Sequence, residues 1–182
     1  MSAVDRLVSS EILSEFLATL DEYAEKAKEL YKRKLTDKGI NASYKLLNSV
    51  ETTVKRNGDE FTVTINLEDY WYYVENGRKA GRFPPIDKIL EWIRVKPVIP
   101  YSDSRGRLPT EEQLAFLIAR KIAEQGTEGR NVLFETVDEL NRYYLPKLQQ
   151  ALDDDFARFS YEIDTYIGSI RVGQVLIQDR KL

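Results

Sequence analysis

Residues 70–92 read Y-W-Y-Y-V-E-N-G-R-K-A-G-R-F-P-P-I-D-K-I-L-E-W, and this stretch decides the fold of the chain. Four aromatic residues and a valine come first, a basic loop punctuated by glycine follows, and two prolines open an amphipathic segment. We predict a helical turn over residues 69–76, a loop over 77–85 and a helix over 86–95. Pro85 stands near the start of that helix, where a missing N–H costs least. No enzyme signature has this form.

The aromatic run cannot all face the interior, because successive helical residues point about 100° apart. At least one or two of Tyr70, Trp71, Tyr72 and Tyr73 therefore face outward or sideways. Exposed aromatic residues either anchor subunit interfaces or stack on bases, and we favour core plus interface. Trp92 is expected in the core, with its indole N–H bonded to the backbone.

The basic loop places Arg78, Lys79 and Arg82 around Gly81. Three interpretations stay open: contact with a neighbouring subunit, which we favour, a solvated loop that needs glycine flexibility, and phosphate contacts in a DNA channel. The spacing of a nucleotide-binding P-loop is absent. A second polar loop over residues 97–109 carries Arg105 and Arg107, and we expect both loops at subunit boundaries.

On the N-terminal side, apolar residues at three-and-four spacing predict a long helix over residues 4–35, ended near Gly39. Alternation about Asn57-Gly58 then predicts a β-hairpin with these two residues at its tip. The apolar face of the hairpin must be covered, and the first helix is the obvious candidate.

On the C-terminal side, Thr110 is expected to cap a helix that ends near Gly126. Residues 132–134 fit either a short strand or a helix entry, and Pro146 predicts a break before a new helix. Asp153, Asp154 and Asp155 are expected on a solvated helical face, since consecutive residues do not converge on one ion. The inner face of the helix after Thr110 is predicted to comprise Leu114, Phe116, Leu117, Ile118 and Ile122.

Residues 168–182 lose the helical pattern and gain β-branched residues. Val175 and Ile177 suit an extended β segment, which must add to a sheet edge somewhere. We favour an arm that reaches another subunit; a strand folded back on its own domain and a disordered tail remain open.

The composition of the chain excludes several classes of function. The chain of 182 residues has no histidine and no cysteine, which excludes His-based acid–base catalysis, thiolate chemistry, disulfides and most zinc sites. We expect no enzymatic activity, no cofactor and no metal. No apolar run reaches membrane-span length, and the N-terminus does not resemble a signal peptide. The net charge of −3 is uneven: residues 70–130 are net basic, with 11 basic against 8 acidic side chains, and both flanks are net acidic.

These patterns predict an α+β fold: a long N-terminal helix on a small antiparallel sheet, further helices, and a helical C-terminal extension with a β-like tail. We place the main domain at residues 1–145 and the extension at 146–182.

Several landmarks resemble the phage neck and tail-completion (head–tail connector) family. They are the first helix, the L-L-N-S-V of residues 46–50, the hairpin, the aromatic block with Val74, Glu75, Gly77, Arg78, Lys79 and Gly81, the F-P-P of residues 83–85, and residues 113–127. The likeness covers about residues 5–140 and is close to versions in crAss-like phages of Bacteroidales. Residues 146–182 extend past the usual end of the family.

The resemblance implies a structural virion protein: one subunit of a ring of six or twelve copies that joins portal to tail around a DNA channel. Its implied partners are further copies of itself, the portal or an adjacent ring, tail proteins, and DNA that passes without sequence-specific binding. The implied location is the virion neck or tail, with host cytoplasm during assembly. The alternative is a sequence-independent DNA-binding protein that uses the basic 77–107 region. The expected subunit interface comprises Trp71, Tyr72, Arg78, Lys79, Arg82, Arg105, Arg107, Val175 and Ile177.

Overall fold

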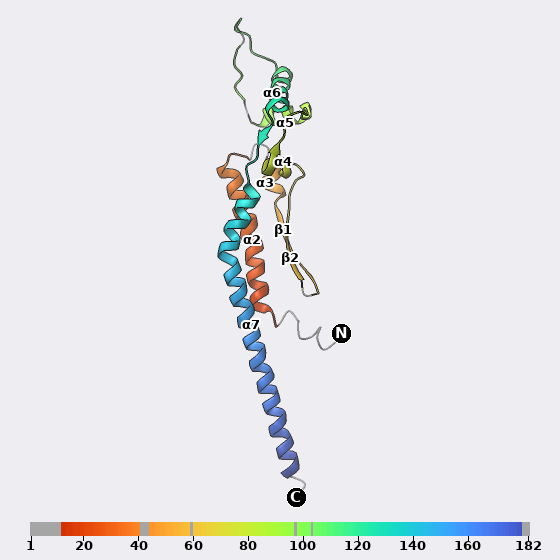
Figure 1. Ribbon diagram of the computed structural model, residues 1–182, viewed down its shortest axis with the longest axis vertical. Coiled ribbons are helices and arrows are strands. Elements are labelled where there is room, and N and C mark those ends of the chain that lie inside the picture. The colour runs from red at the N-terminus through yellow and green to blue at the C-terminus, as the bar shows by residue number, and fades with distance from the viewer. Residues whose placement is uncertain (1–11, 41–43, 59, 97, 103, 180–182) are drawn as a thin grey trace. The chain divides into compact units, whose positions relative to one another are not determined.

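A computed structural model describes residues 12–40, 44–58, 60–96, 98–102 and 104–179, with side chains to residue 165 (Figure 1). The described chain is α+β, as predicted: helices predominate, and two small antiparallel sheets accompany them. The backbone forms two compact units. We call residues 25–139 the central unit, and residues 1–24 with 140–182 the terminal unit. The long helices α2 (Ser14–Asp37) and α7 (Val132–Asp179) contribute to both units.

Helix α2 confirms the predicted first helix from Ser14 onward and extends it to Asp37, whereas Ile12 and Leu13 form a turn. Its buried side chains recur at three-and-four spacing and comprise Leu20, Ala24, Ala27, Leu30, Tyr31 and Leu35. The helix ends where Gly39 adopts a φ of 65°, with the amide of Ile40 donating to the Leu35 carbonyl at 2.9 Å. Residues 4–11 of the predicted helix lie outside the described residues.

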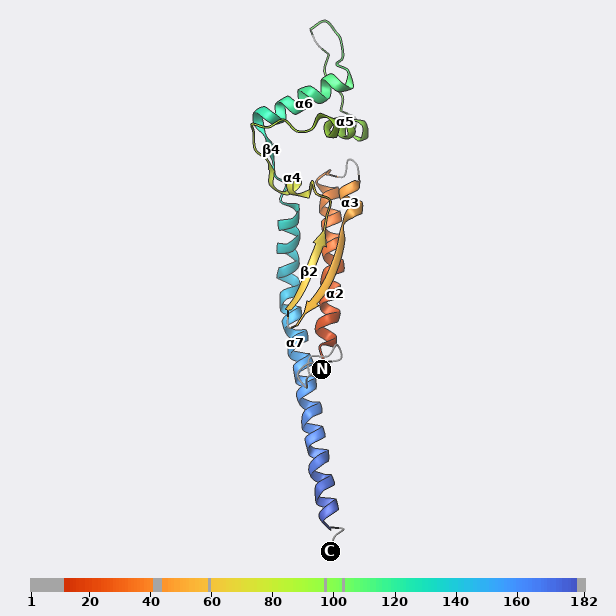
Figure 2. The ribbon, with the colours of Figure 1, turned by 90° about the vertical axis from the view of Figure 1, so that its right-hand side faces the viewer.

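The core of the central unit gathers Tyr31, Leu35, Leu46, Val50 and Val132, all almost fully buried. Leu46 belongs to the short helix α3 (Lys45–Ser49), and Val50 leads directly into the hairpin. Ile65 and Leu67, at the base of the hairpin, pack on this cluster, which includes Tyr31 and Leu35 of α2, so the base of the hairpin lies against the first helix. The hairpin leaves α3 next to the C-terminal end of α2 (Figures 1 and 2).

The hairpin itself, β1 (Glu51–Asn57) with β2 (Glu60–Asn66), is antiparallel, as predicted. Its turn lies one residue later than expected. Asn57 pairs with Glu60, so Asn57 is the last residue of its strand, and Gly58 with a φ of 63° enters the turn. Gly58 belongs to the turn in either register, and glycine adopts this positive φ at low cost.

Three predicted helices follow: α4 (Trp71–Asn76), α5 (Ile86–Val95) and α6 (Glu111–Gln125). Thr110 caps α6 as predicted, and its hydroxyl accepts the amide of Gln113 while the Gln113 side chain accepts the amide of Thr110. We call residues 79–126, which hold α5, α6 and the 97–109 loop, the lobe. Helices α5 and α6 lie together within it (Figure 2).

Helix α7 corrects two predictions. It begins at Val132, which decides the open choice over residues 132–134 in favour of helix, and it continues through Pro146, so the predicted break is wrong. The missing N–H of Pro146 costs helix stability, but Leu140, Tyr144 and Ala151 are buried on either side of it and hold the helix together. The predicted β arm is also wrong, because α7 remains helical to Asp179. Extending an existing helix is far easier than starting one, and this outweighs the weak β preference of the tail.

In the terminal unit, Asp155 corrects the prediction of a solvated aspartate run. Asp153 and Asp154 are exposed, but Asp155 is fully buried. Its carboxylate accepts the backbone amides of Glu15 and Phe16 and pairs with Arg158 at 2.6 Å. A carboxylate at this position satisfies amides that the first turn of a helix leaves unpaired. Asp155 therefore sets the start of α2 at Ser14.

Aromatic contacts complete the terminal unit. The rings of Tyr23 and Tyr144 meet edge to face, with centroids 5.6 Å apart. Both hydroxyls are satisfied: Tyr23 donates to the Asn141 side chain at 3.0 Å, and Tyr144 donates to Glu22 at 2.8 Å. Buried tyrosine hydroxyls need such partners, so these contacts set the register between α2 and α7 in this unit.

Candidate subunit interface

A pair of very short strands joins the lobe to the rest of the central unit, and the sequence did not predict it. Strand β3 (Gly77–Arg78) pairs with β4 (Thr127–Glu128), which lies 49 residues later in the chain. A Cβ on Gly77 would lie 2.2 Å from the carbonyl oxygen of Thr127, and one on Gly126 would lie 2.2 Å from that of Arg78. Both glycines also have φ above 70° with extended ψ, a conformation nearly restricted to glycine. We call the β3–β4 strand pair, together with Gly77 and Gly126, the glycine neck.

Arg78 organises the loop that follows the neck. Its guanidinium donates to the carbonyl oxygens of Arg82 at 3.3 Å and Phe83 at 3.2 Å, and it lies 5.5 Å from the ring centroid of Tyr73. The amide of Gly81 donates to the carbonyl oxygen of Ala123 at 2.7 Å, which ties the same loop to the end of α6. These bonds tie the loop to its own first residue and to α6, and Arg78 is half-buried.

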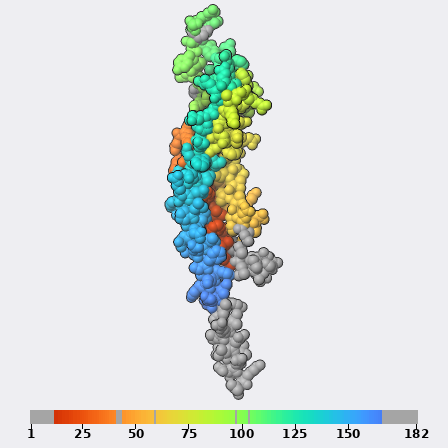
Figure 3. All heavy atoms as spheres, viewed as in Figure 1, coloured from red at the N-terminus to blue at the C-terminus, as the bar shows by residue number. Residues whose placement is uncertain are grey.

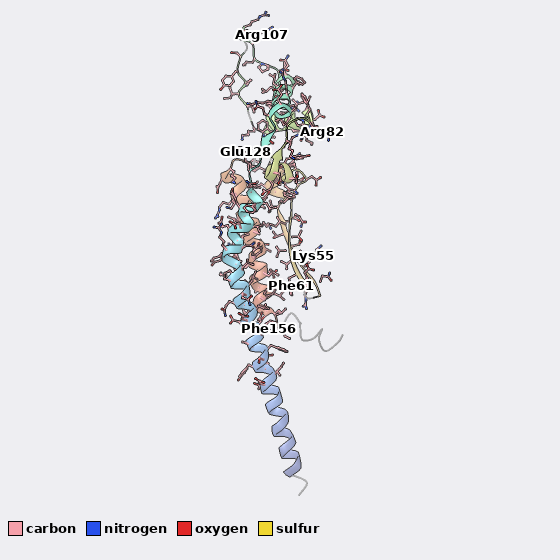
Figure 4. The ribbon with its side chains drawn as sticks, viewed as in Figure 1. Lys55, Phe61, Arg82, Arg107, Glu128 and Phe156 are labelled. Atoms are coloured by element: carbon pink, nitrogen blue, oxygen red, sulfur yellow. The ribbon has the colours of Figure 1, made fainter. Side chains whose placement is uncertain are left out.

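The other predicted basic residues are exposed but do not form one patch. Lys79 and Arg82 lie on the loop after the neck, whereas Arg105 and Arg107 lie on the long loop between α5 and α6. Arg82 and Arg107 are well separated (Figure 4). A single surface that uses all of them would therefore have to extend across the lobe.

The aromatic run divides between core and surface, as predicted. Trp71 is half-buried and packs on the central core, while Tyr72 and Tyr73 are more than half exposed. Successive rings meet edge to face, with centroids 6.1 Å apart for Trp71 and Tyr72. The segment that contains them appears in yellow-green at the surface (Figure 3). The hydroxyl of Tyr70 has a structural role, because it accepts the amide of Leu46 at 2.7 Å and so holds α3.

The outer surface of the lobe is apolar, which the sequence prediction missed. Phe116 and Leu117, expected inside, are 48% and 51% exposed, and the small residues Ala115 and Ala119 form the buried face of α6 instead. The run of apolar residues at 114–118 is too long for one helical face, and this signal could have revealed the exposed pair. The Phe83 ring lies 5.9 Å from that of Phe116. We call this surface the lobe face; it comprises Phe83, Tyr101, Arg107, Leu108, Phe116 and Leu117.

An open groove of about 840 Å³ runs along the lobe face between α6 and the 97–109 loop. Tyr101 and Leu108 reach it from the loop, and Arg107 and Glu112 supply charges at its sides. Leu108 is 64% exposed and Tyr101 is 95% exposed. An apolar surface with a polar border of this kind is typical of a protein–protein contact.

A smaller open cleft of about 530 Å³ lies near the neck and includes Trp92. The prediction that Trp92 belongs to the core is wrong, because its side chain is 38% exposed. Ile93 takes the buried position of α5 instead, and Trp92, one residue earlier, is turned by about 100° from it. Charged residues flank the cleft: Lys96, Glu128 and Arg130.

Helix α7 carries a second exposed apolar surface, in the terminal unit. Leu145 is 57% exposed, Phe156 is 56% exposed and Ile163 is 39% exposed. Leu152 and Phe159 are half-buried and complete a pattern with spacings of three, four and seven residues. We call these five residues the α7 stripe. Val175 and Ile177, also predicted at the interface, belong to the same helix, but their side chains lie outside the described residues.

A buried carboxylate, Glu75, supports the start of α7 in the central unit. It accepts the backbone amide of Leu133 at 2.7 Å and that of Phe134 at 2.9 Å. Its own carbonyl oxygen accepts the amide of Asn131 at 3.3 Å. Burial raises the pKa of the Tyr31 hydroxyl strongly, and the negative charge of Glu75 adds to the increase.

Within the described ranges, no group of three or more acidic residues is arranged to hold a metal ion. Among the described helices, none is both long and apolar enough to cross a membrane.

Comparisons with protein-family models, with curated proteins and with solved structures find no match to this chain.

Proposed function

We propose that this chain is a structural subunit of a phage head–tail connector ring, with six or twelve copies that join portal to tail around the DNA channel. Its partners are further copies of itself, the portal or an adjacent ring, and tail proteins, and it performs no enzymatic step. The proposed location is the virion neck or tail, with host cytoplasm during assembly. The proposal combines the sequence resemblance with the surfaces of the central and terminal units.

The observation that carries the proposal is the presence of two separate exposed apolar surfaces, the lobe face and the α7 stripe. Single exposed apolar residues are common, but contiguous patches on a soluble chain mark interaction sites. A ring of identical subunits with rotational symmetry needs two different contact surfaces on each subunit, one for each neighbour. A chain with two such surfaces meets this requirement.

Assembly is the decisive test. Native mass spectrometry and sedimentation velocity of the purified chain, over a concentration series, should give a closed species of six or twelve copies. A bare monomer at every concentration would contradict the proposal. Visible rings of another copy number in electron micrographs would preserve the architecture and change only the stoichiometry.

The basic region supports one other function, sequence-independent DNA binding. Residues 77–107 contain the basic residues Arg78, Lys79, Arg82, Lys88, Arg94, Lys96, Arg105 and Arg107 against Asp87, Glu91 and Asp103. Several of these already bind within the chain: Arg94 pairs with Glu111 at 3.0 Å, and Arg78 holds its own loop. This internal pairing favours the connector role, since a channel that lets DNA slide should attract it only weakly.

Duplex binding by the isolated chain distinguishes the two functions. We expect no submicromolar binding at physiological salt. Each neutralised phosphate would add about 0.9 to the logarithmic salt slope of a true DNA-binding protein. Tight binding with a steep salt slope, reduced by charge reversal of Arg105 and Arg107, would favour the DNA-binding function.

A further inference from the structure

The lobe face and the α7 stripe differ in charge. The lobe, residues 79–126, has nine basic and six acidic side chains, while at the groove itself Arg107 and Glu112 supply one charge of each sign. Residues 145–164, which carry the α7 stripe, have the opposite balance: Asp153, Asp154, Asp155, Glu162 and Asp164 against Lys147 and Arg158. Arg158 is already paired with the buried Asp155, and the helical period places the exposed Asp153 and Asp164 beside the stripe. The lobe is therefore net basic, and the helical segment that carries the α7 stripe is net acidic.

The two surfaces also suit each other in form. The α7 stripe lies along one side of a helix, beside the face on which Ala151 and Asp155 are buried. The lobe face has an open groove between α6 and the 97–109 loop. An apolar side of a helix laid in an apolar groove is a common mode of protein recognition, with contacts repeating every three or four residues.

We propose that the lobe face of one copy binds the α7 stripe of the next copy. Arg107 faces the acidic border of the stripe, and Phe116 and Leu117 contact Phe156 and its neighbours. The contact is head-to-tail, because the two surfaces are different, and repetition of a head-to-tail contact gives a ring when its rotation closes. Opposite charges at the borders set the orientation and disfavour pairing of two lobe faces or two stripes. This assignment rests on the proposed ring and names the contact that builds it.

Cysteine crosslinking tests the contact directly, since the chain has no native cysteine. Leu117→Cys marks the lobe face, Phe156→Cys marks the α7 stripe, and Thr53→Cys on the exposed side of β1 is the matched control. Each variant is first checked by circular dichroism and thermal melting. The variants are then treated with a short bismaleimide, alone and as equimolar mixtures, and resolved on denaturing gels.

The expected result is a crosslinked dimer in the mixture of Leu117→Cys with Phe156→Cys, at roughly tenfold the yield of either variant alone, because opposite border charges favour unlike surfaces. A chain that carries both cysteines should give a ladder of oligomers. Mixtures that contain Thr53→Cys should give background only.

Other outcomes separate the contact from the ring. If native mass spectrometry shows a ring but the mixture gives no dimer, the ring stands and this contact is wrong. Dimers from Phe156→Cys alone would show pairing of two α7 stripes and would also overturn the head-to-tail contact. A chain that stays monomeric at all concentrations and yields no crosslinks would overturn both proposals together.

Discussion

Oδ2 of Asp155 accepts the backbone amide of Phe16 at 2.8 Å, although 139 residues separate the two in the chain. Oδ1 of the same carboxylate accepts the amide of Glu15 at 3.2 Å. One side chain in the middle of α7 thus satisfies two amides that the start of α2 leaves without helical partners. The contact links the two ends of the sequence within the terminal unit.

Replacement of this carboxylate should be costly. Asp155→Ala leaves two amides of α2 without their acceptor, and we expect a loss of about 2 kcal/mol in the free energy of unfolding, the upper end for a helix cap. Asp154→Ala is the matched control, since Asp154 is exposed and should change stability by less than about 0.5 kcal/mol. Urea unfolding of both variants is the measurement. Equal, small effects would show that the cap adds little.

Alkaline pH should destabilise the chain through Tyr31. Because the folded state raises its pKa above the ordinary value of 10.0, its contribution to stability is complete below pH 10 and is lost as pH rises through the folded pKa. The expected slope is about 1.4 kcal/mol per pH unit for one proton. Burial raises the pKa of Tyr23 in the same direction. Tyr31→Phe should flatten the decline above pH 10 in urea titrations, and an unchanged slope would assign the decline to other groups.

Replacement of Pro146 should increase the stability of the folded chain. Pro146→Ala restores the amide that the helix lacks at this position, a gain of about 3 kcal/mol in a helix interior, less about 1 kcal/mol for greater freedom of the unfolded chain. We expect the urea midpoint to rise. Gln150→Ala, one turn further along the same helix, should leave it nearly unchanged. A fall in stability for Pro146→Ala would mean that the proline ring contributes packing that outweighs the hydrogen bond.

The glycine neck should tolerate no side chain. Gly126→Ala places a Cβ 2.2 Å from the carbonyl oxygen of Arg78, and backbone must move to admit it. We expect a loss of at least about 3 kcal/mol, from positive φ together with overpacking. Gly39→Ala isolates the first of these effects, because Gly39 has a φ of 65° with nothing within 4 Å of an added Cβ, and it should cost only about 1 kcal/mol. Similar melting temperatures for the two variants would argue against the close approach.

Charge reversal at Arg78 and at Lys79 should distinguish an effect on folding from an effect on assembly. Arg78→Glu removes the contacts to Arg82 and Phe83, so it should lower both the melting temperature and the yield of oligomer. Lys79→Glu, on an exposed neighbour, should leave the melting temperature unchanged and weaken assembly by roughly tenfold if the loop borders a subunit contact. Sedimentation velocity and thermal melting together give the answer. Unchanged assembly for Lys79→Glu would remove this loop from the interface.

Local patterns predicted the local structure well. The alternating apolar residues on both sides of Gly58 predicted the hairpin, and the pattern after Pro85 predicted both ends of α5. Such elements depend on residues that are neighbours in the chain. The Thr110 cap belongs to the same class, since its partner Gln113 is three residues away.

Contacts between residues that are far apart in the chain could not be predicted from the sequence. The carboxylates of Glu75 and Asp155 accept helix-start amides that lie 58 and 140 residues away, and nothing nearby in the chain marks either role. For Asp155 one signal was available: it lies four residues after the buried Ala151, so the helical period places it on the inner face. The β3–β4 pair is only two residues long in each strand, too short for alternation to reveal.

The glycine neck also makes the lobe a replaceable module. The chain enters the lobe after Arg78 and leaves it before Thr127, and these two residues are paired across the neck. A segment whose ends meet can be exchanged, lengthened or shortened without disturbing the core that Leu46 and Val132 help to build. The exposed side chains of the lobe can therefore differ from one chain to another while the supporting fold stays the same.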